Sequence, residues 1–217
     1  RNYGYLADNQ GNIVAVNLET MRPVWHYHNH DDTDASIVVE EENGIPFLYT
    51  GCEVDKQGDT GFCYFVKLNG LTGEVVWEQK IEGCKAQLAK TTEGGMFATP
   101  LIGHGDCEGL IFSNINTMRR DNWGNLIAFD KSTGEIRYRT PLNFYSWSSP
   151  VALYNENSEM FIVTGDTLGS IYIIRGKDGS VLPDEGEVLL IKCTAQLLLH
   201  GDKQQISVFR PETFPEA

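Results

Sequence analysis

Long apolar runs, basic residues and recognisable catalytic motifs are all scarce in this sequence. No apolar stretch of the 217-residue chain approaches the roughly 20 residues that a membrane-spanning helix needs. The 17 basic residues are outnumbered by 30 acidic ones, and the formal charge of −13 opposes binding to a polyanion. No Gly-rich phosphate loop, nucleophile elbow or zinc-protease motif is present. The sequence therefore predicts no membrane-spanning helix and no nucleic-acid partner, and it favours binding over catalysis.

Cysteine is also sparse and gives little information on compartment. The five residues are Cys52, Cys63, Cys84, Cys107 and Cys193, and no two of them are adjacent. An odd count leaves at least one thiol unpaired, and the spacing fits neither a zinc pair nor a compact disulfide framework. The cysteines therefore predict neither a zinc site nor a disulfide-rich domain.

One strand-turn-strand pattern recurs along the chain and is its most informative feature. Each copy has a Gly, an apolar run, a tight turn and a large apolar or aromatic residue at the end. The copies cover residues 11–25, 61–77, 124–138 and 169–182. Their turns read Thr72-Gly73-Glu74, Thr133-Gly134-Glu135 and Asp178-Gly179-Ser180, with residues 19–23 as a degenerate copy. Gly suits such turns because it reaches positive φ without steric cost, and repeats of this kind predict one supersecondary unit used several times.

Further apolar segments precede the central run of each copy, so the unit has four short strands, labelled A to D. We expect the units at residues 3–28, 35–82, 97–142 and 148–182, and the first of them enters directly on strand B. Trp25 and Trp77 lie at the end of strand D. Because buried aromatic side chains usually serve packing, we expect these two to pack between neighbouring units.

The repeat resembles that of quinoprotein-like β-propellers, whose blades carry the motif G-x-h-x-A-h-D-x-x-T-G-E-x-x-W, where h is apolar. Residues 124–138 fit this motif at nearly every position, with Tyr138 in place of the terminal Trp, and residues 61–77 fit with an insertion before Thr72. The resemblance covers residues 3–182. It implies an all-β propeller of four-stranded antiparallel blades, a scaffold that unrelated activities share.

The repeats leave the size of the propeller open. About four blades fit in this chain, within the usual range of about 4 to 8, whereas seven- and eight-bladed members dominate the family it resembles. We therefore expect a segment of a larger propeller, completed by a longer chain or by a second copy. The alternative is a closed ring, in which residues 183–217 supply the A–B hairpin that closes or starts a blade and so remove an exposed sheet edge.

In such a blade the B–C and D–A connections fall at one end of the sheets, which we call the loop face, and the A–B and C–D turns fall at the other, the turn face. The long connections in this sequence are of the first kind and cover residues 26–34, 52–60, 78–97 and 114–123. Long connections in a compact domain often carry function. We therefore expect any binding site on the loop face.

Two groups of residues on the loop face are candidate sites. His26, His28, His30 and Asp31 bring together imidazole and carboxylate, a common donor set for a transition metal, although their spacing matches no known ligand signature and a solvated blade exit is the alternative. Arg119, Arg120, Trp123, Tyr145 and Trp147 offer guanidinium and aromatic groups for a carboxylate, sugar or peptide. For the second group, packing onto the sheet and solvation are the alternatives.

The resemblance also bears on function and location. Quinone dehydrogenases of this family hold pyrroloquinoline quinone with calcium in the channel, and many have an adjacent-cysteine disulfide beside it, which this sequence lacks. The sequence is therefore more similar to the non-catalytic outer-membrane assembly members. We expect a binding or scaffold module for a protein or glycan, with no cofactor and a cell-envelope or secreted location. The alternative is a quinone- or metal-dependent oxidoreductase whose site lies partly outside this segment.

Overall fold

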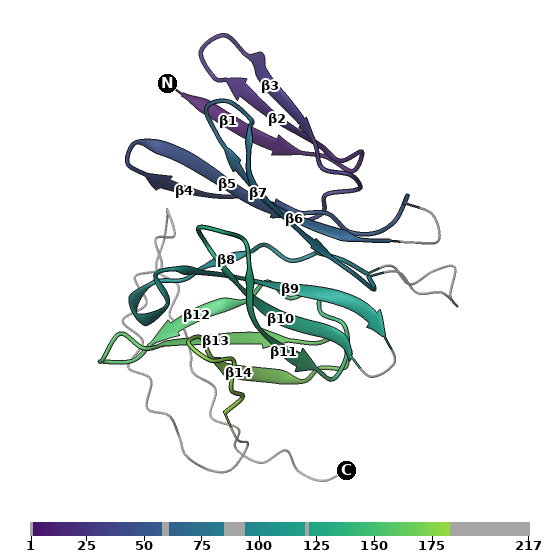
Figure 1. Cartoon of the computed structure of the whole chain (residues 1–217), viewed down its shortest axis with the longest axis vertical. Helices are drawn as coiled ribbons and strands as arrows, with labels where there is room; N and C mark the ends of the chain where they lie inside the picture. Colours follow the sequence, from purple (N-terminus) through teal and green to yellow (C-terminus); the bar gives the residue numbers. More distant parts are fainter. Residues whose placement is uncertain (1, 58–60, 85–93, 120–121, 183–217) are drawn as a thin grey trace, which may run out of the picture.

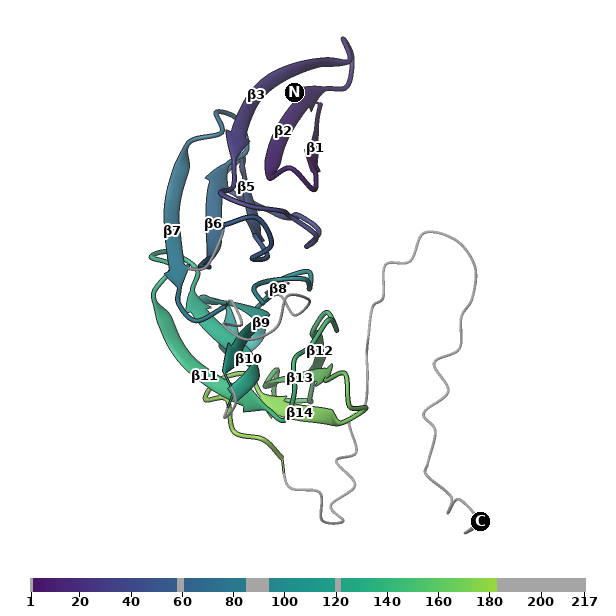
Figure 2. The same ribbon diagram turned by 90° about the vertical axis from the view of Figure 1, so that its right-hand side faces the viewer.

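The computed structural model describes residues 2–57, 61–84, 94–119 and 122–182, and these residues form antiparallel β-structure. The one helical segment among them is the three-residue 3₁₀ turn η1 (Gly105–Cys107), and the described part of the chain contains no helix long and apolar enough to cross a membrane. Four sheets follow one another along the long axis of the molecule, with β1 at the top and β14 at the bottom (Figure 1). In the view turned by 90° about the vertical axis, the four sheets form an arc with β3, β7 and β11 on its outer side (Figure 2).

Each sheet is a simple meander in which consecutive strands pair. The first contains β1 (Tyr3–Ala7), β2 (Asn12–Asn17) and β3 (Arg22–His28). The second contains β4 (Val38–Glu42), β5 (Ile45–Gly51), β6 (Cys63–Asn69) and β7 (Val75–Ile81). The third contains β8 (Leu101–Ile102), β9 (Leu110–Arg119), β10 (Asn122–Asp130) and β11 (Ile136–Leu142). The fourth contains β12 (Val151–Tyr154), β13 (Met160–Gly165) and β14 (Ile171–Arg175).

The predicted all-β propeller fold is confirmed. The second and third sheets have four strands, whereas the first and the fourth have three within the described ranges. The first sheet begins with strand B, and the fourth continues beyond strand C as a single bridge between Ile174 and Val181. The segment 183–217, proposed above as a ring-closing hairpin, lies outside the described residues.

One expected connection is a strand instead. The stretch from Asn114 to Trp123 was expected to be a long B–C loop, yet β9 runs to Arg119 and β10 begins at Asn122. The ladder continues because Asn114 and Asn116 are buried residues of β9 that pair with Leu126 and Gly124 of β10. Polar residues that read as a loop in the sequence are thus accommodated in a strand.

The hydrophobic core lies between the sheets. The largest cluster joins the second and third sheets through Tyr49, Phe65, Trp77, Ile127 and Phe129. A second cluster joins the third and fourth sheets, and a smaller one joins the first and second. The central strands of the second and third sheets are apolar on both faces because each of these sheets is packed between two others.

A clasp of bulge, aromatic ring and glycine recurs between sheets. The pairing of strands C and D shifts register immediately before the residue opposite Ala15, Lys67 or Ala128, and that residue is Trp25, Trp77 or Tyr138. A bulge re-aims the side chain next to it, and here it is followed by a ring that contacts the next sheet. The indole of Trp25 donates to the carbonyl of Gly70 (2.9 Å), that of Trp77 to Lys131 (3.0 Å), and the Tyr138 hydroxyl to Gly176 (2.5 Å).

The turn under each ring must be glycine. Gly73 and Gly134 have φ of 78° and 76°, and a Cβ on them would lie 2.7 Å from the Trp25 ring and 2.6 Å from the Trp77 ring. The Thr-Gly-Glu turn therefore provides both a left-handed backbone and the space for an aromatic ring from the preceding sheet. The expected packing role of Trp25 and Trp77 follows directly from these contacts.

Candidate binding site on the loop face

A row of aromatic rings lies along the loop face of the third and fourth sheets. It comprises Trp123 at the start of β10, Phe144, Tyr145 and Trp147 in the connection from β11 to β12, and Phe97 before β8. Successive ring centroids are 5.2 Å apart for Trp123–Phe144, 4.6 Å for Phe144–Tyr145, 5.8 Å for Tyr145–Trp147 and 6.1 Å for Trp147–Phe97. Trp147 is 62% exposed, so its indole ring is accessible to solvent at this point of the aromatic row.

Buried amides hold the segment that carries the aromatic row. Asn116 accepts from the Ser146 backbone N–H (2.8 Å) and donates to the Ser146 carbonyl (3.1 Å). Asn114 donates to the Ser146 hydroxyl (3.0 Å), which itself donates to the Gly165 carbonyl (2.6 Å). Because these groups are buried, the bonds fix the backbone between Tyr145 and Trp147 in one conformation, as a preformed binding surface requires.

Acidic side chains gather on the same face, at the junction of the first and second sheets. Asp32 and Asp34 come from the connection between β3 and β4, and Glu53 comes from the connection between β5 and β6. One carboxylate oxygen of each of the three lies within 4.8 Å of the others. We call these three residues the acidic cluster.

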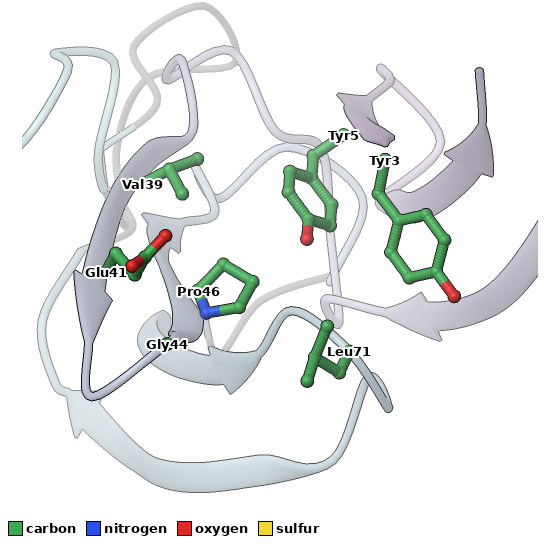
Figure 3. A pocket seen from close by; sticks show the side chains of 7 residues that line it. All are labelled: Tyr3, Tyr5, Val39, Glu41, Gly44, Pro46 and Leu71. Atoms are coloured by element: carbon green, nitrogen blue, oxygen red, sulfur yellow. The ribbon is translucent and has the colours of Figure 1, made fainter. Parts of the chain in front are cut away.

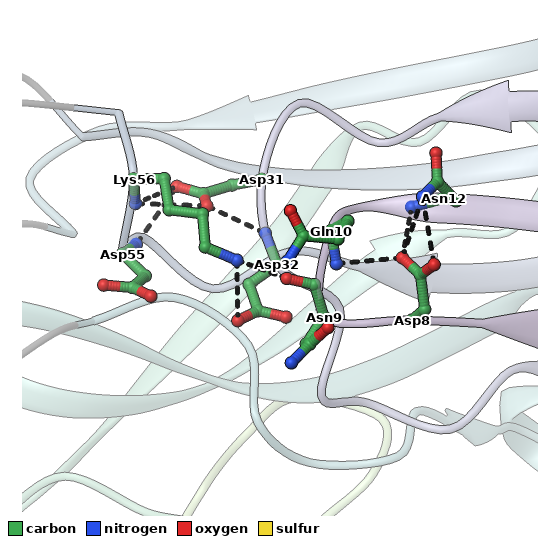
Figure 4. A network of polar contacts seen from close by, with 8 residues as sticks. All are labelled: Asp8, Asn9, Gln10, Asn12, Asp31, Asp32, Asp55 and Lys56. Atoms are coloured by element: carbon green, nitrogen blue, oxygen red, sulfur yellow. Dashed lines mark hydrogen bonds and ion pairs between the residues drawn. The ribbon is translucent and has the colours of Figure 1, made fainter.

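Asp31 organises the backbone around the acidic cluster. Its carboxylate accepts from the N–H groups of Asp32 (2.8 Å), Asp55 (3.0 Å) and Lys56 (3.0 Å). Figure 4 shows this fan of bonds, with the Lys56 ammonium 3.4 Å from Asp32 Oδ2. The Glu53 N–H also donates to the Asp32 carbonyl (2.9 Å). These hydrogen bonds join the β3–β4 connection to the β5–β6 connection without the help of a ligand.

The electrostatics of the acidic cluster disfavour full ionisation. Burial, together with the negative charges of Asp34 and Asp32, raises the pKa of Glu53 to about 8. Burial and the neighbouring Asp32 and Asp55 likewise raise the pKa of Asp34, although Lys56 partly opposes the shift. These shifts have the usual causes, namely desolvation of a charged carboxylate and repulsion by like charges.

A short strip of backbone pairing connects the acidic cluster to the aromatic row. Glu53 bridges Gly95, and Gly95 bridges Asn116 on β9, in antiparallel pairs. The Gly95 and Asn116 N–H groups donate to each other's carbonyl at 2.8 and 2.9 Å. Glu53 thus lies at one end of the strip, and the amide that holds Ser146 lies at the other.

The structure does not bring the expected histidine donors together. The His26 Nε2 lies 2.7 Å from the Asn12 side-chain oxygen, and the His30 Nε2 lies 2.8 Å from Glu78. His28 is exposed, and Asp31 is occupied by backbone donors. Within the described ranges, the acidic cluster is the only group of three or more His, Cys, Asp or Glu donors close enough to share an ion.

His30 departs from the expected geometry for a local reason. Alternate histidines on a strand point to one side, but β3 ends at His28 and His30 has a φ of 61°. Its ring turns away and stacks on Tyr64, with 3.8 Å between the ring centroids.

The second expected group is assembled in part. Trp123, Tyr145 and Trp147 all belong to the aromatic row, whereas Arg119 is the last residue of β9 and Arg120 lies outside the described residues. The sequence reasoning placed Trp123 on a loop, and it lies instead on a strand that continues the third sheet.

Several residues of the loop face were missed in the sequence. Phe97 and Phe144 complete the aromatic row, and the aromatic-rich stretch from Phe144 to Trp147 was the available signal for one of them. Asp32, Asp34 and Glu53 were not predicted as a group. The dense acidic run from Asp31 to Asp34 was visible, but Glu53 joins it only through the pairing of two connections.

A pocket of about 490 Å³ lies on the turn face, between the first and second sheets. Tyr3 and Tyr5 of β1 face Val39 and Glu41 of β4 across it, with Gly44, Pro46 and Leu71 completing the wall (Figure 3). Pyrroloquinoline quinone is a polycarboxylate, and Glu41 is the only charged residue among the described residues that line this pocket. The described lining offers no basic group to bind the carboxylates, so this pocket does not fit the cofactor.

Comparisons with known proteins agree with the fold. The chain is similar to quinohemoprotein alcohol dehydrogenases from Comamonas testosteroni (14% identity, TM-score 0.56, covering 83% of this chain and 33% of that one) and Pseudomonas putida (15%, 0.55, 86% and 33%). It is also similar to the propeller of Dos1 (10%, 0.52, 83% and 44%).

This chain thus spans about a third of the length of the two dehydrogenases. No protein-family model and no curated protein sequence matches it. At these identities the likeness shows the β-propeller fold, which the quinone-dependent dehydrogenases share.

Proposed function

We propose that this chain is a non-catalytic binding module of a quinoprotein-like propeller, and that it recognises a glycan or protein through the aromatic row. The observation that carries the proposal is the continuous contact of five rings on the loop face, ending at the exposed indole of Trp147. Exposed aromatic surface that is held in place is typical of binding sites rather than of ordinary protein surface.

A neutral glycan is the ligand that best matches this surface. The C–H faces of pyranose rings stack on the electron-rich faces of aromatic side chains, and hydroxyl groups bond to polar neighbours. The aromatic row has such neighbours in the exposed residues Asn143, Ser148 and Ser149. The formal charge of −13 disfavours acidic glycans by long-range repulsion.

The test is binding of a panel of neutral oligosaccharides and polysaccharides, measured by isothermal titration calorimetry and affinity electrophoresis. Trp147→Ala and Tyr145→Ala are expected to weaken binding at least about tenfold, the loss of about 1.4 kcal/mol that one stacked ring readily supplies. Val75→Ala is the matched control, because Val75 is an exposed apolar residue at the turn-face end of β7. Equal binding by Trp147→Ala and wild type would refute a role for the aromatic row.

A protein ligand and an enzymatic role are separated in the same series. Loss of a protein partner, rather than of glycan binding, in the Trp147→Ala variant would identify a protein-binding face. Addition of pyrroloquinoline quinone with calcium, followed by a dye-linked assay of alcohol oxidation, tests the oxidoreductase alternative. Turnover in that assay would overturn the non-catalytic proposal.

A further inference from the structure

We propose that Asp32, Asp34 and Glu53 form a site for a divalent cation of the calcium type on the loop face. The proposal is independent of the proposed glycan or protein ligand. It rests on the geometry of the three carboxylates, on a buried Asp32 oxygen that lacks a donor, and on the balance of charge around them.

The separation of the three oxygens matches one ion. Calcium–oxygen distances of about 2.3–2.6 Å mean that two ligands of the same ion lie at most about 5 Å apart. The three carboxylate oxygens of the acidic cluster all lie within 4.8 Å of one another. Each can therefore reach a common centre with small side-chain movements.

One carboxylate oxygen of the acidic cluster is buried without a donor. Asp32 is 7% exposed, and its Oδ1 has no hydrogen-bond partner anywhere in the described part of the chain. Glu53 is 6% exposed, and its carboxyl group lies close enough to the Asp32 carboxyl to interact with it directly. A buried carboxylate oxygen without a partner is costly in a native fold, and a bound cation is the partner that this geometry provides.

The charges of the surrounding residues leave a deficit of positive charge. Asp31 flanks the acidic cluster, and Lys56 is the one cation among the described residues with an ion pair to it, at 3.4 Å from Asp32 Oδ2. The Lys56 side chain is half exposed and also donates to the Asn9 carbonyl (Figure 4). One shared ammonium group does not neutralise this many carboxylates, whereas a divalent ion supplies two further charges at their centre.

The chemistry of the donors selects the class of ion. All three ligands are carboxylates, with no imidazole or thiolate among them, and hard oxygen donors suit calcium or magnesium rather than zinc or copper. Asp34 is exposed, so solvent can complete the coordination sphere. A flexible sphere of carboxylates and water fits calcium better than magnesium, which demands a near-ideal octahedron at about 2.0–2.1 Å.

The experiment is thermal unfolding and calorimetric titration of the purified chain, first stripped with a chelator and then given calcium or magnesium chloride. The calorimetric titration should saturate, and at a calcium concentration about 100-fold above Kd linkage predicts a rise in Tm of about 5 °C or more for a chain of this size. Magnesium is expected to produce a smaller rise. Glu53→Gln and Asp34→Asn should each weaken calcium binding at least tenfold, and Glu135→Gln, an exposed acid on the turn face, is the matched control.

A second readout separates a ligand from a merely structural residue. In chelator, Glu53→Gln removes a carboxyl group whose ionised form is disfavoured by burial and by its acidic neighbours, and should raise Tm, whereas in excess calcium wild type should be the more stable protein. Asp34→Asn keeps the test valid if Glu53→Gln fails to fold. Absence of a saturable calcium response in wild type, or responses of equal size in Glu53→Gln and Glu135→Gln, would overturn the proposal.

Discussion

Replacement of Trp77 by Ala tests the clasp that joins the second and third sheets. Trp77 is 7% exposed, packs against Phe65 with 5.4 Å between centroids, and donates to the Lys131 carbonyl at 3.0 Å. Removal of a buried Trp costs about 3–5 kcal/mol through lost transfer energy and a cavity. Total stability of a domain is about 5–15 kcal/mol, so the variant should unfold at much lower urea concentration than wild type.

The Gly134 turn allows the same reasoning to be checked by coupling. In wild type, Gly134→Ala places a methyl group 2.6 Å from the Trp77 ring and strains a residue with φ of 76°. In the Trp77→Ala background the steric clash is relieved and only the backbone strain remains, about 1–2 kcal/mol. The two changes should therefore be less than additive, by about 0.5–3 kcal/mol.

The assay is urea unfolding followed by circular dichroism, with Trp147→Ala as control. Trp147 is exposed, so its replacement should change the free energy of unfolding by less than about 0.5 kcal/mol. A loss below about 1 kcal/mol for Trp77→Ala, or full additivity with Gly134→Ala, would refute the clasp.

Three further outcomes are expected from the structure. Asn116→Ala leaves the buried N–H and C=O of Ser146 without partners. The variant should lose about 2–4 kcal/mol of stability and bind glycan more weakly. Unchanged stability and binding would show that the aromatic row is held by other contacts. Tyr138→Phe removes the hydroxyl bond to Gly176 and should lower stability by about 1 kcal/mol in the urea assay; no change would limit the clasp to ring packing. The folded-state pKa of Glu53, about 8, exceeds the unfolded value of about 4.3. The contribution of Glu53 to the free energy of unfolding is therefore fully present below a pH of about 4.3 and is lost as pH rises through about 8. In chelator, Tm of wild type relative to Glu53→Gln should fall across this range, and a flat difference would contradict the raised pKa.

The repeat made the fold predictable because each blade forms its turn and buries its aromatic ring with the same types of residue. Thr-Gly-Glu specifies a turn with positive φ, and an aromatic residue a few positions later must be buried, so sequence and structure agree at Gly134 and Trp77. The bulge beside each aromatic was not predicted, since no residue type marks it. It follows from the extra residue that fits between the turn and the ring.

The site was less predictable because most of its residues lie on connections between strands. The indole of Trp123 and the ring of Trp147 were recognised as candidates, but their neighbour Phe97 comes from another connection. Likewise, Glu53 meets Asp32 only after two connections are joined by hydrogen bonds. Contacts of this kind depend on tertiary packing, which strand periodicity does not predict.

The direction of the clasp has a consequence for synthesis on the ribosome. Each ring contacts a turn that lies later in the chain, with separations of 45, 54 and 38 residues between the donor ring and the accepting carbonyl. A newly made Trp25 or Trp77 therefore remains uncovered until the next sheet has left the ribosome. The chain is synthesised at about 5–20 residues per second, so each ring is exposed for several seconds. The sheets are therefore expected to be completed one after another from the N-terminal side.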